Sequence, residues 1–125
     1  MPFAPGLHGS AKLIVADADT ALAMHTGEVR VLATPRLIAL CEEAAIAAVV
    51  DDVPAAHTTV GMRVQIDHLA PVSIGSSVAA EATLDKVEGR RLTFTVTVND
   101  ACGLVAAGKV TRVVVETDHF LGKAR

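Results

Sequence analysis

Aromatic residues are almost missing from this chain of 125 residues, which has no tryptophan, no tyrosine and three phenylalanines. The hydrophobic core must therefore be built from Ala, Val, Leu and Ile, whose small side chains let backbones approach closely. Hydrophobic residues nevertheless make up 51% of the chain, and an apolar excess in a small protein is often buried between subunits. The composition predicts a single globular domain over residues 1–125 that works as an oligomer.

Cysteine, net charge and long apolar runs are also scarce. Cys41 and Cys102 have neither metal-ligand spacing nor a disulfide framework, which favours a reducing cytoplasm as the location. The net charge of −3, without a basic run, weighs against nucleic acid or an anionic membrane surface as the partner. The longest apolar stretch, residues 44–50, is too short to span a bilayer, and residues 1–6 have no signal-peptide pattern.

The hydrophobic pattern predicts one helix and five strands. Residues 36–50 are rich in Leu, Ala, Ile and Glu, and Thr34 followed by Pro35 is a good helix start because the Thr hydroxyl can cap free N–H groups. Alternation with a period of two predicts strands at 9–15, 58–68, 77–87, 91–100 and 104–116, and the tail from Thr117 is expected to fray. Consecutive strands joined by short turns predict an α+β fold in which an antiparallel sheet wraps a single helix.

Three polar side chains interrupt otherwise apolar patterns. Glu42 shares a helical stripe with Ile38 and Ile46, whereas its neighbour Glu43 shares a solvated edge with Arg36. An acid among aliphatic groups is costly unless it is paired or functional; otherwise the helix is half buried and both acids meet water. His68 ends an apolar row formed by Val60, Met62, Val64 and Ile66, so it is either a hydrogen-bonded core histidine or a functional one. Thr34 is either only the helix cap or a third member of a hydrolytic site.

The spacing of Thr34, Glu42 and His68, with Gly61 seven residues before the histidine, resembles the hot-dog thioesterases of the group that includes fluoroacetyl-CoA thioesterase. The segment 87–92 resembles the same group, and the likeness runs from Leu13 to Val115. It implies a hot-dog fold, with a five-stranded antiparallel sheet around one central helix. It also implies that Thr34, Glu42 and His68 are catalytic, in a cleft at the interface of a homodimer or homotetramer.

The resemblance further implies an acyl-CoA thioesterase that hydrolyses a small or medium acyl thioester to the free acid and CoA. No metal is expected, nor any cofactor other than the coenzyme A of the substrate. The Gly61 backbone N–H would hold the thioester carbonyl, and Arg90 and Arg91 would bind the phosphates of coenzyme A. Further candidates for the phosphates are Arg63, Lys109 and Arg112. Residues 17–33 contain no aromatic residue, so we expect a general aliphatic pocket of Leu, Val, Ile and Met rather than selectivity for fluoroacetyl groups.

Two other functions stay open on the sequence. One is a hot-dog hydratase or dehydratase acting on enoyl or hydroxyacyl thioesters, for which related folds use an Asp–His pair. Asp67 and His68 are adjacent, so they are expected on opposite faces of their strand. The other is a non-catalytic acyl-CoA binding protein, because function depends on the site and not on the fold. The thioester carrier, coenzyme A or an acyl carrier protein, also stays open.

Overall fold

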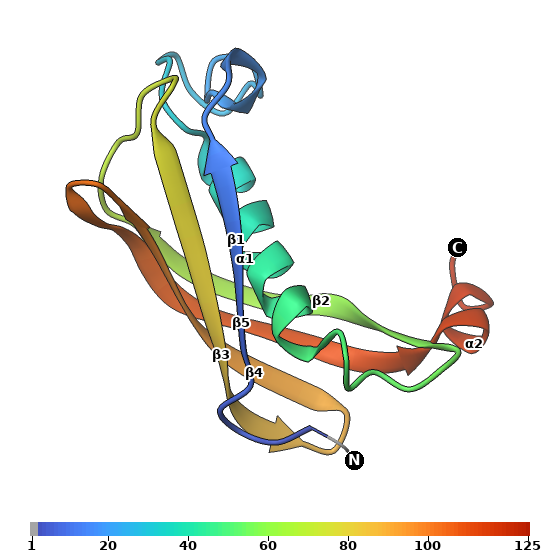
Figure 1. The fold of residues 1–125 in the computed structure, drawn as a ribbon. Coiled ribbons are helices and arrows are strands. Elements are labelled where there is room, and N and C mark those ends of the chain that lie inside the picture. Colours follow the sequence, from blue (N-terminus) through green and yellow to red (C-terminus); the bar gives the residue numbers. More distant parts are fainter. Residues whose placement is uncertain (1–2) are drawn as a thin grey trace.

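Helix α1 (Thr34–Val49) lies in the concave side of a curled antiparallel sheet of five strands (Figure 1). The structure is a computed structural model that describes residues 3–125. The other elements are the strands β1 (His8–Ile14), β2 (His57–His68), β3 (Ser77–Glu88), β4 (Arg91–Asp100) and β5 (Gly103–Glu116), the 3-10 turn η1 (Asp17–Asp19) and the short helix α2 (Thr117–Leu121). The predicted α+β fold is therefore confirmed, and each predicted strand agrees with the structure to within one residue.

The strand order is β1-β3-β4-β5-β2, so β1 and β2 form the two edges of the sheet. β3, β4 and β5 follow one another in space and in sequence because short turns join antiparallel neighbours directly. β2 reaches its edge position through the connection that follows α1 and pairs with β5 along its whole length. None of the helices formed by residues 3–125 is long and apolar enough to cross a membrane.

Small residues let α1 sit directly on the sheet. A Cβ atom added to Gly9 of β1 would lie 2.2 Å from the backbone nitrogen of Ala48 and 2.5 Å from the carbonyl oxygen of Ala44. Glycine is therefore required at position 9, where β1 passes against the helix backbone. The core predicted from Ala, Val, Leu and Ile is confirmed, except that Phe94 on β4 is its largest fully buried side chain and no isoleucine is fully buried in the described residues.

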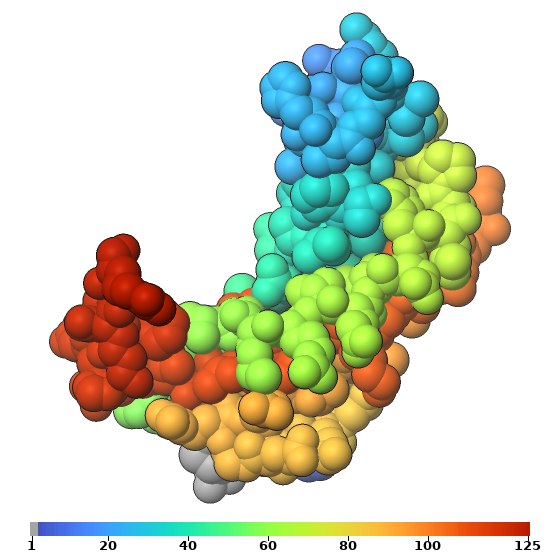
Figure 2. Space-filling model, turned by 180° about the vertical axis from the view of Figure 1, so that it is seen from behind, coloured from blue at the N-terminus to red at the C-terminus, as the bar shows by residue number. Residues whose placement is uncertain are grey.

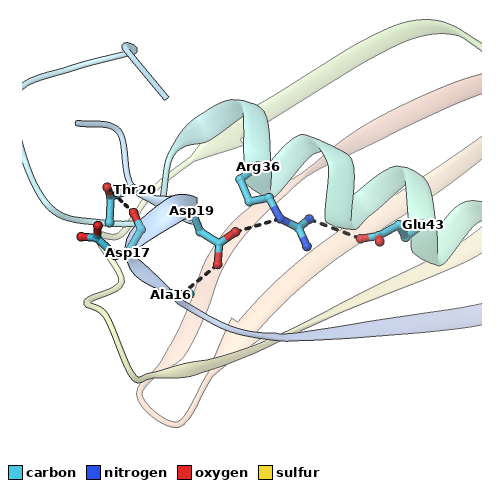
Figure 3. A network of polar contacts seen from close by, with 6 residues as sticks. All are labelled: Ala16, Asp17, Asp19, Thr20, Arg36 and Glu43. Atoms are coloured by element: carbon cyan, nitrogen blue, oxygen red, sulfur yellow. Dashed lines mark hydrogen bonds and ion pairs between the residues drawn. The ribbon is translucent and has the colours of Figure 1, made fainter. Parts of the chain in front are cut away.

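A network of charged groups fixes the connection between β1 and the start of α1 (Figure 3). The carboxylate of Asp19 accepts hydrogen bonds from the backbone N–H of Ala16 at 2.8 Å and from Nε of Arg36 at 3.2 Å. Nη1 of Arg36 lies 3.4 Å from Oε2 of Glu43, two turns further along the exposed side of α1. The prediction that Glu43 lies on a solvated edge with Arg36 is confirmed.

The prediction of a frayed tail is wrong. Residues after β5 form α2, which lies beside the start of β2 (Figure 1). The backbone N–H of Thr117 donates a hydrogen bond of 3.0 Å to the carbonyl of Ala56, in the turn that precedes β2. This bond ties the end of β5 to the start of β2, a contact between distant segments that local patterns do not reveal.

A β-bulge in β2 also corrects the predicted strand faces. The pairing with β5 shifts between Gly61 and Arg63, which leaves Met62 as an extra residue. Val64, Ile66 and His68 face α1 as predicted, but before the bulge it is Gly61 that faces α1, not Val60 or Met62. The prediction assumed a strict alternation through the whole strand. Because the bulge adds one residue, that assumption assigns the side chains before the bulge to the wrong face.

Candidate active site

Thr34 and His68 meet where the start of α1 passes over the end of β2. Oγ1 of Thr34 lies 2.9 Å from Nδ1 of His68. The predicted helix cap is wrong, because Ala33 is the N-cap residue and no side chain caps this end. The hydroxyl of Thr34 is directed across to β2 instead, so the structure joins two of the three predicted catalytic residues by a hydrogen bond.

The other ring nitrogen of His68 is left without a partner. Nε2 is inaccessible to solvent and has no hydrogen-bond partner among residues 3–125. Asp67 is exposed and lies on the opposite strand face, so the structure does not form the Asp–His pair of a hydratase from these two residues. A buried nitrogen of this kind normally finds a partner, so Nε2 is placed to serve a group from outside the chain.

Glu42 is held by Arg112 of β5, a contact that the sequence analysis missed. Nη1 of Arg112 donates a hydrogen bond of 2.8 Å to Oε1 of Glu42. The same guanidinium donates through Nε to Oγ1 of Thr59 at 3.1 Å and through Nη2 to the Thr59 carbonyl at 2.9 Å. Only 6% of the Arg112 side chain is exposed, so its prediction as a phosphate ligand is wrong. An arginine among the valines of residues 110–115 was the available signal for a buried ion pair.

Glu42 and Cys41 lie on the same turn of α1, and of these two side chains Glu42 is the one suited to react with a substrate. Burial lowers the pKa of Arg112, and the charge of Glu42 and its hydrogen bond oppose that shift; an arginine stays protonated near neutral pH all the same. The Glu42 side chain is 30% exposed, so the carboxylate reaches the surface while Arg112 orients it. Burial and the neighbouring Glu42 raise the pKa of Cys41 to about 11, which keeps that thiol protonated and a poor nucleophile.

Gly61 lies directly against the Glu42 carboxylate. A Cβ atom added to Gly61 would be 2.5 Å from Oε1 of Glu42 and 3.6 Å from Nη1 of Arg112. The bulged part of β2 therefore approaches the ion pair at the one residue type that leaves room for it. Glu42, Arg112 and Gly61 form a second cluster, from α1, β5 and β2.

We expect Gly61→Ala to lower kcat for the reaction at this site by roughly tenfold to a hundredfold, because a displacement of about 1 Å of a reacting group has effects of this size. The methyl group must push the Glu42 carboxylate away from its position beside Arg112. The midpoint of thermal unfolding should change little, because the atom displaced is the end of a flexible side chain. Unchanged kcat in the folded variant would contradict the assigned position of Glu42.

The two clusters are far apart within one chain. Thr34 and Glu42 are eight residues apart on α1, which separates their Cα atoms by about 12 Å. Gly61 and His68 are seven residues apart on β2, a separation of roughly 20 Å. The structure thus brings Thr34 to His68 and Glu42 to Gly61, but it does not bring all four to one point in a single chain.

A hollow of about 320 Å³ adjoins the Thr34–His68 pair. Small aliphatic side chains line most of it, and it contains no Phe, Tyr or Trp, as the composition of residues 17–33 predicts. Ile and Met are not part of this lining, contrary to the expected composition; its members include Ala21, Val29, Val31, Leu32, Leu69 and Ala70. Across residues 3–125, no three His, Cys, Asp or Glu side chains come close enough to hold a metal ion.

The two predicted phosphate ligands of the hairpin face different hollows. Arg91 lines a small one on the outer side of the sheet together with Arg63 and Lys109. Arg90 lines a hollow of about 400 Å³ beneath α2. Arg90 lies in the turn before β4 and Arg91 is the first residue of that strand, so the hairpin separates these two adjacent arginines.

A five-stranded sheet curled around one helix, with a helical glutamate and a threonine–histidine pair on the concave side, defines a hot-dog protein of the thioesterase class. Residues 15–118 match the family described as FlK, fluoroacetyl-CoA-specific thioesterase. The chain belongs to this family. A relative, the fluoroacetyl-CoA thioesterase of Streptantibioticus cattleyicolor, is 30% identical over 95 residues, which cover 76% of this chain and 68% of the relative.

Solved structures agree with this assignment of the fold. A structure of the fluoroacetyl-CoA thioesterase FlK is 24% identical, has a TM-score of 0.91, and the match covers 97% of this chain and 94% of that one. A hot-dog-like protein from Thermanaerovibrio acidaminovorans is 27% identical with a TM-score of 0.88, over 97% of this chain and 90% of that one. The predicted hot-dog fold and thioesterase membership are confirmed.

Proposed function

We propose that this protein hydrolyses acyl-CoA thioesters to the free acid and CoA, with Glu42, His68 and Thr34 as the catalytic residues. The observation that carries the proposal is the Glu42 carboxylate, oriented by Arg112 at 2.8 Å, partly exposed and in contact with the Gly61 backbone. A general base must be held in place and must still reach its substrate, and both conditions are met here.

In the proposed reaction, Glu42 acts on the thioester carbonyl either as the base that activates water or as the nucleophile itself. The Gly61 backbone N–H supports the negative charge that develops on the carbonyl oxygen. The carbon–sulfur bond then breaks, and His68, positioned by Thr34, handles the proton that the CoA thiol gains. Water supplies the oxygen of the acid and both protons of the products, so the site needs no cofactor beyond the coenzyme A of its substrate.

We further propose that the enzyme is a homodimer formed through β2. This strand is an edge of the sheet, and its outer side presents unpaired N–H and C=O groups to another strand. Exposed apolar side chains accompany this edge, with Met62 at 46% and Leu69 at 61% exposure, and Ile46 of α1 lies one turn from Glu42 at 42%. A second copy of the chain, added to this edge, would cover them.

The charges of the exposed side chains, and the sheet face on which each side chain lies, favour one register for the pairing of two β2 strands. Residues directly opposite each other in an antiparallel pair share a face of the sheet. A two-fold axis at Gln65 puts Val64 opposite Ile66 of the partner subunit. Both residues lie on the face of β2 that is turned toward α1. The same axis puts Arg63 opposite Asp67 of the partner subunit, twice in the dimer, and both are exposed side chains of opposite charge. Such opposite-charge pairs stabilise a strand pairing.

This register also completes the site. Because Met62 is the extra residue of the bulge and is left out of the pairing, Gly61 comes to lie opposite His68 of the partner subunit. The cluster of Glu42 and Arg112 in one chain then faces the Thr34–His68 pair of the other. The roughly 20 Å that separates these clusters within one chain is thereby removed. The unpartnered Nε2 of His68 then has a carboxylate or a substrate beside it.

The acyl group would occupy the hollow of about 320 Å³ beside Thr34 and His68, whose aliphatic lining suits an aliphatic acyl chain. Its lining contains no Lys or Arg that would pair with a second carboxylate, and no Phe, Tyr or Trp. Both cysteines are free thiols, which supports the cytoplasm as the place of action.

Thiol release from a panel of acyl-CoAs tests the proposed function. The panel runs from acetyl and fluoroacetyl to long aliphatic and aromatic acyl groups, and we expect saturable release that is greatest for an aliphatic chain longer than acetyl and unaffected by EDTA. Loss of enoyl absorbance without thiol release would show a hydratase instead. Tight CoA binding with no release from any thioester would show a binding protein, and both results would overturn the proposal.

A further inference from the structure

A basic hollow lies at the end of β2 that is remote from His68. Its volume is about 400 Å³, and its lining includes His57, Arg90, His119, Phe120 and Lys123. These residues come from three distant parts of the chain: the start of β2, the β3–β4 hairpin, and the helix α2 with Lys123, which is two residues beyond its end. Figure 2 shows the C-terminal segment, in red, standing up from the start of β2. The clusters around Glu42 and around Thr34 and His68 use none of these five side chains, of which Arg90 alone is among the predicted phosphate ligands.

The charges in the basic hollow favour an anion. Arg90 and Lys123 bring two positive charges against one negative charge, that of Glu116, so the lining is positive in a chain whose net charge is −3. Nδ1 of His57 donates a hydrogen bond of 2.9 Å to the Ala55 carbonyl, which leaves Nε2 of the ring as its second polar group. Nε2 is the ring atom that would contact a phosphate bound in this hollow.

An aromatic ring stands beside these cations. Phe120 is one of only three phenylalanines in the chain, and 40% of it is exposed. Stacking of a nucleobase on an exposed aromatic side chain strengthens binding, whichever base it is. Cations and a stacking ring in one hollow are the pattern expected for a nucleotide.

The backbone under the basic hollow is held in an unusual conformation. Ala56 has φ of +65°, in the left-handed region that a non-glycine residue seldom adopts. The bond from the Thr117 N–H to the Ala56 carbonyl holds this turn against the start of α2. Such strain persists only where the surroundings enforce it, and it is frequent at ligand sites; here it sets the position of His57.

A second hollow leads from the basic one toward Glu42. It has a volume of about 330 Å³, is lined mainly by apolar residues such as Ile46, Val50 and Pro54, and shares His57 with the basic hollow. At its other end lies Thr59, which accepts two hydrogen bonds from Arg112. From His57 to Gly61 the strand advances about 13 Å, a distance within the reach of a pantetheine arm, which is comparable to a short extended peptide.

We infer that the basic hollow binds the nucleotide end of coenzyme A, with Arg90 and Lys123 on its phosphates and Phe120 stacked on the adenine. The inference rests on the proposed function and adds its substrate geometry. The pantetheine arm runs through the apolar hollow along the start of β2 and delivers the thioester to Glu42. Arg90, but not its neighbour Arg91, belongs to this site.

The test compares two substrates that carry the same acyl group, an acyl-CoA and the matching acyl-pantetheine, which lacks the nucleotide. In the double variant Arg90→Ala/Lys123→Ala, we expect KM for the acyl-CoA to rise about tenfold or more while kcat stays the same, because charge-assisted hydrogen bonds to phosphate are lost. Phe120→Ala should raise the same KM by about tenfold. The kinetic constants for acyl-pantetheine should not change in either variant.

The matched control is Lys12→Ala/Lys86→Ala, which removes two exposed cations elsewhere on the sheet. An equal rise of KM in this control would show a general effect of net charge and would overturn the inference. So would an unchanged KM for acyl-CoA in the Arg90→Ala/Lys123→Ala variant.

Direct binding separates this inference from the proposed function. Adenosine 3′,5′-bisphosphate, titrated calorimetrically, should bind the wild-type protein and should lose most of its affinity in the Arg90→Ala/Lys123→Ala variant. If the bisphosphate binds through these residues but the protein releases no thiol from any thioester, the inferred nucleotide site is supported and the proposed hydrolase function is refuted. Hydrolysis of acyl-pantetheine with no binding of the bisphosphate would do the reverse.

Discussion

Replacing Glu42 by glutamine is expected to lower kcat for acyl-CoA hydrolysis by about two orders of magnitude or more, the usual contribution of a general base or nucleophile. The substitution keeps the shape of the side chain, and the amide oxygen can still accept the hydrogen bond from Arg112. It removes the negative charge and the basicity that the reaction needs. The measurement is thiol release at saturating acyl-CoA, with a thermal unfolding scan to show that the variant is folded.

Glu43→Gln is the matched control for this experiment. Glu43 is the next residue on α1, carries the same charge and lies 3.4 Å from Arg36 on the exposed side of the helix (Figure 3). It takes no part in the site, so its variant should keep kcat within about twofold of wild type, as most surface changes have small effects. Near wild-type turnover in folded Glu42→Gln, or an equal loss in both variants, would refute the role of Glu42.

Two inactive variants should restore each other's activity when they share a dimer. His68→Ala is expected to lose about two orders of magnitude in kcat, as Glu42→Gln does. If each site combines Glu42 of one chain with His68 of the other, a mixed dimer contains one intact site and one doubly altered site. Random mixing makes half of the dimers mixed, so activity should recover to about a quarter of the wild-type value per chain, given a symmetric pairing.

The matched control mixes Glu42→Gln with the double variant Glu42→Gln/His68→Ala. No mixed dimer of this pair contains an intact site, so the mixture should stay inactive. Native mass spectrometry would confirm that the subunits exchange in both mixtures. Exchange without recovery would show that each site lies within one chain, and full activity in a monomer would remove the proposed dimer altogether.

The structure also changes the meaning of the three polar residues that stood out in the sequence. Glu42 is neither isolated in an apolar stripe nor simply solvated, since it is paired with an arginine from the last strand. His68 is hydrogen-bonded, as a core histidine would be, but through one nitrogen only. Thr34 exchanges the expected role of helix cap for a bond to His68. None of the three residues therefore has only the structural role, as a solvated acid, a core histidine or a helix cap, that its sequence pattern also allowed.

The sequence by itself determined the class and order of the elements. Helix periodicity, strand alternation and short turns depend on neighbouring residues, and these patterns predicted the helix and all five strands within one or two residues of the observed bounds. The spacing of Thr34, Glu42, Gly61 and His68 was also sufficient to indicate the thioesterase family, because a motif of this kind is a property of the chain.

Only the tertiary structure decided how these residues are paired. Arg112 is 70 residues from Glu42, and nothing local to either residue reveals a contact that forms when β5 passes under α1. The bulge that turns Gly61 toward the helix breaks the period of two on which strand predictions depend. The basic hollow likewise combines the start of β2, a hairpin and the C-terminal helix. Such contacts join segments that meet only after the sheet has curled around the helix, and short-range patterns carry no information about that step.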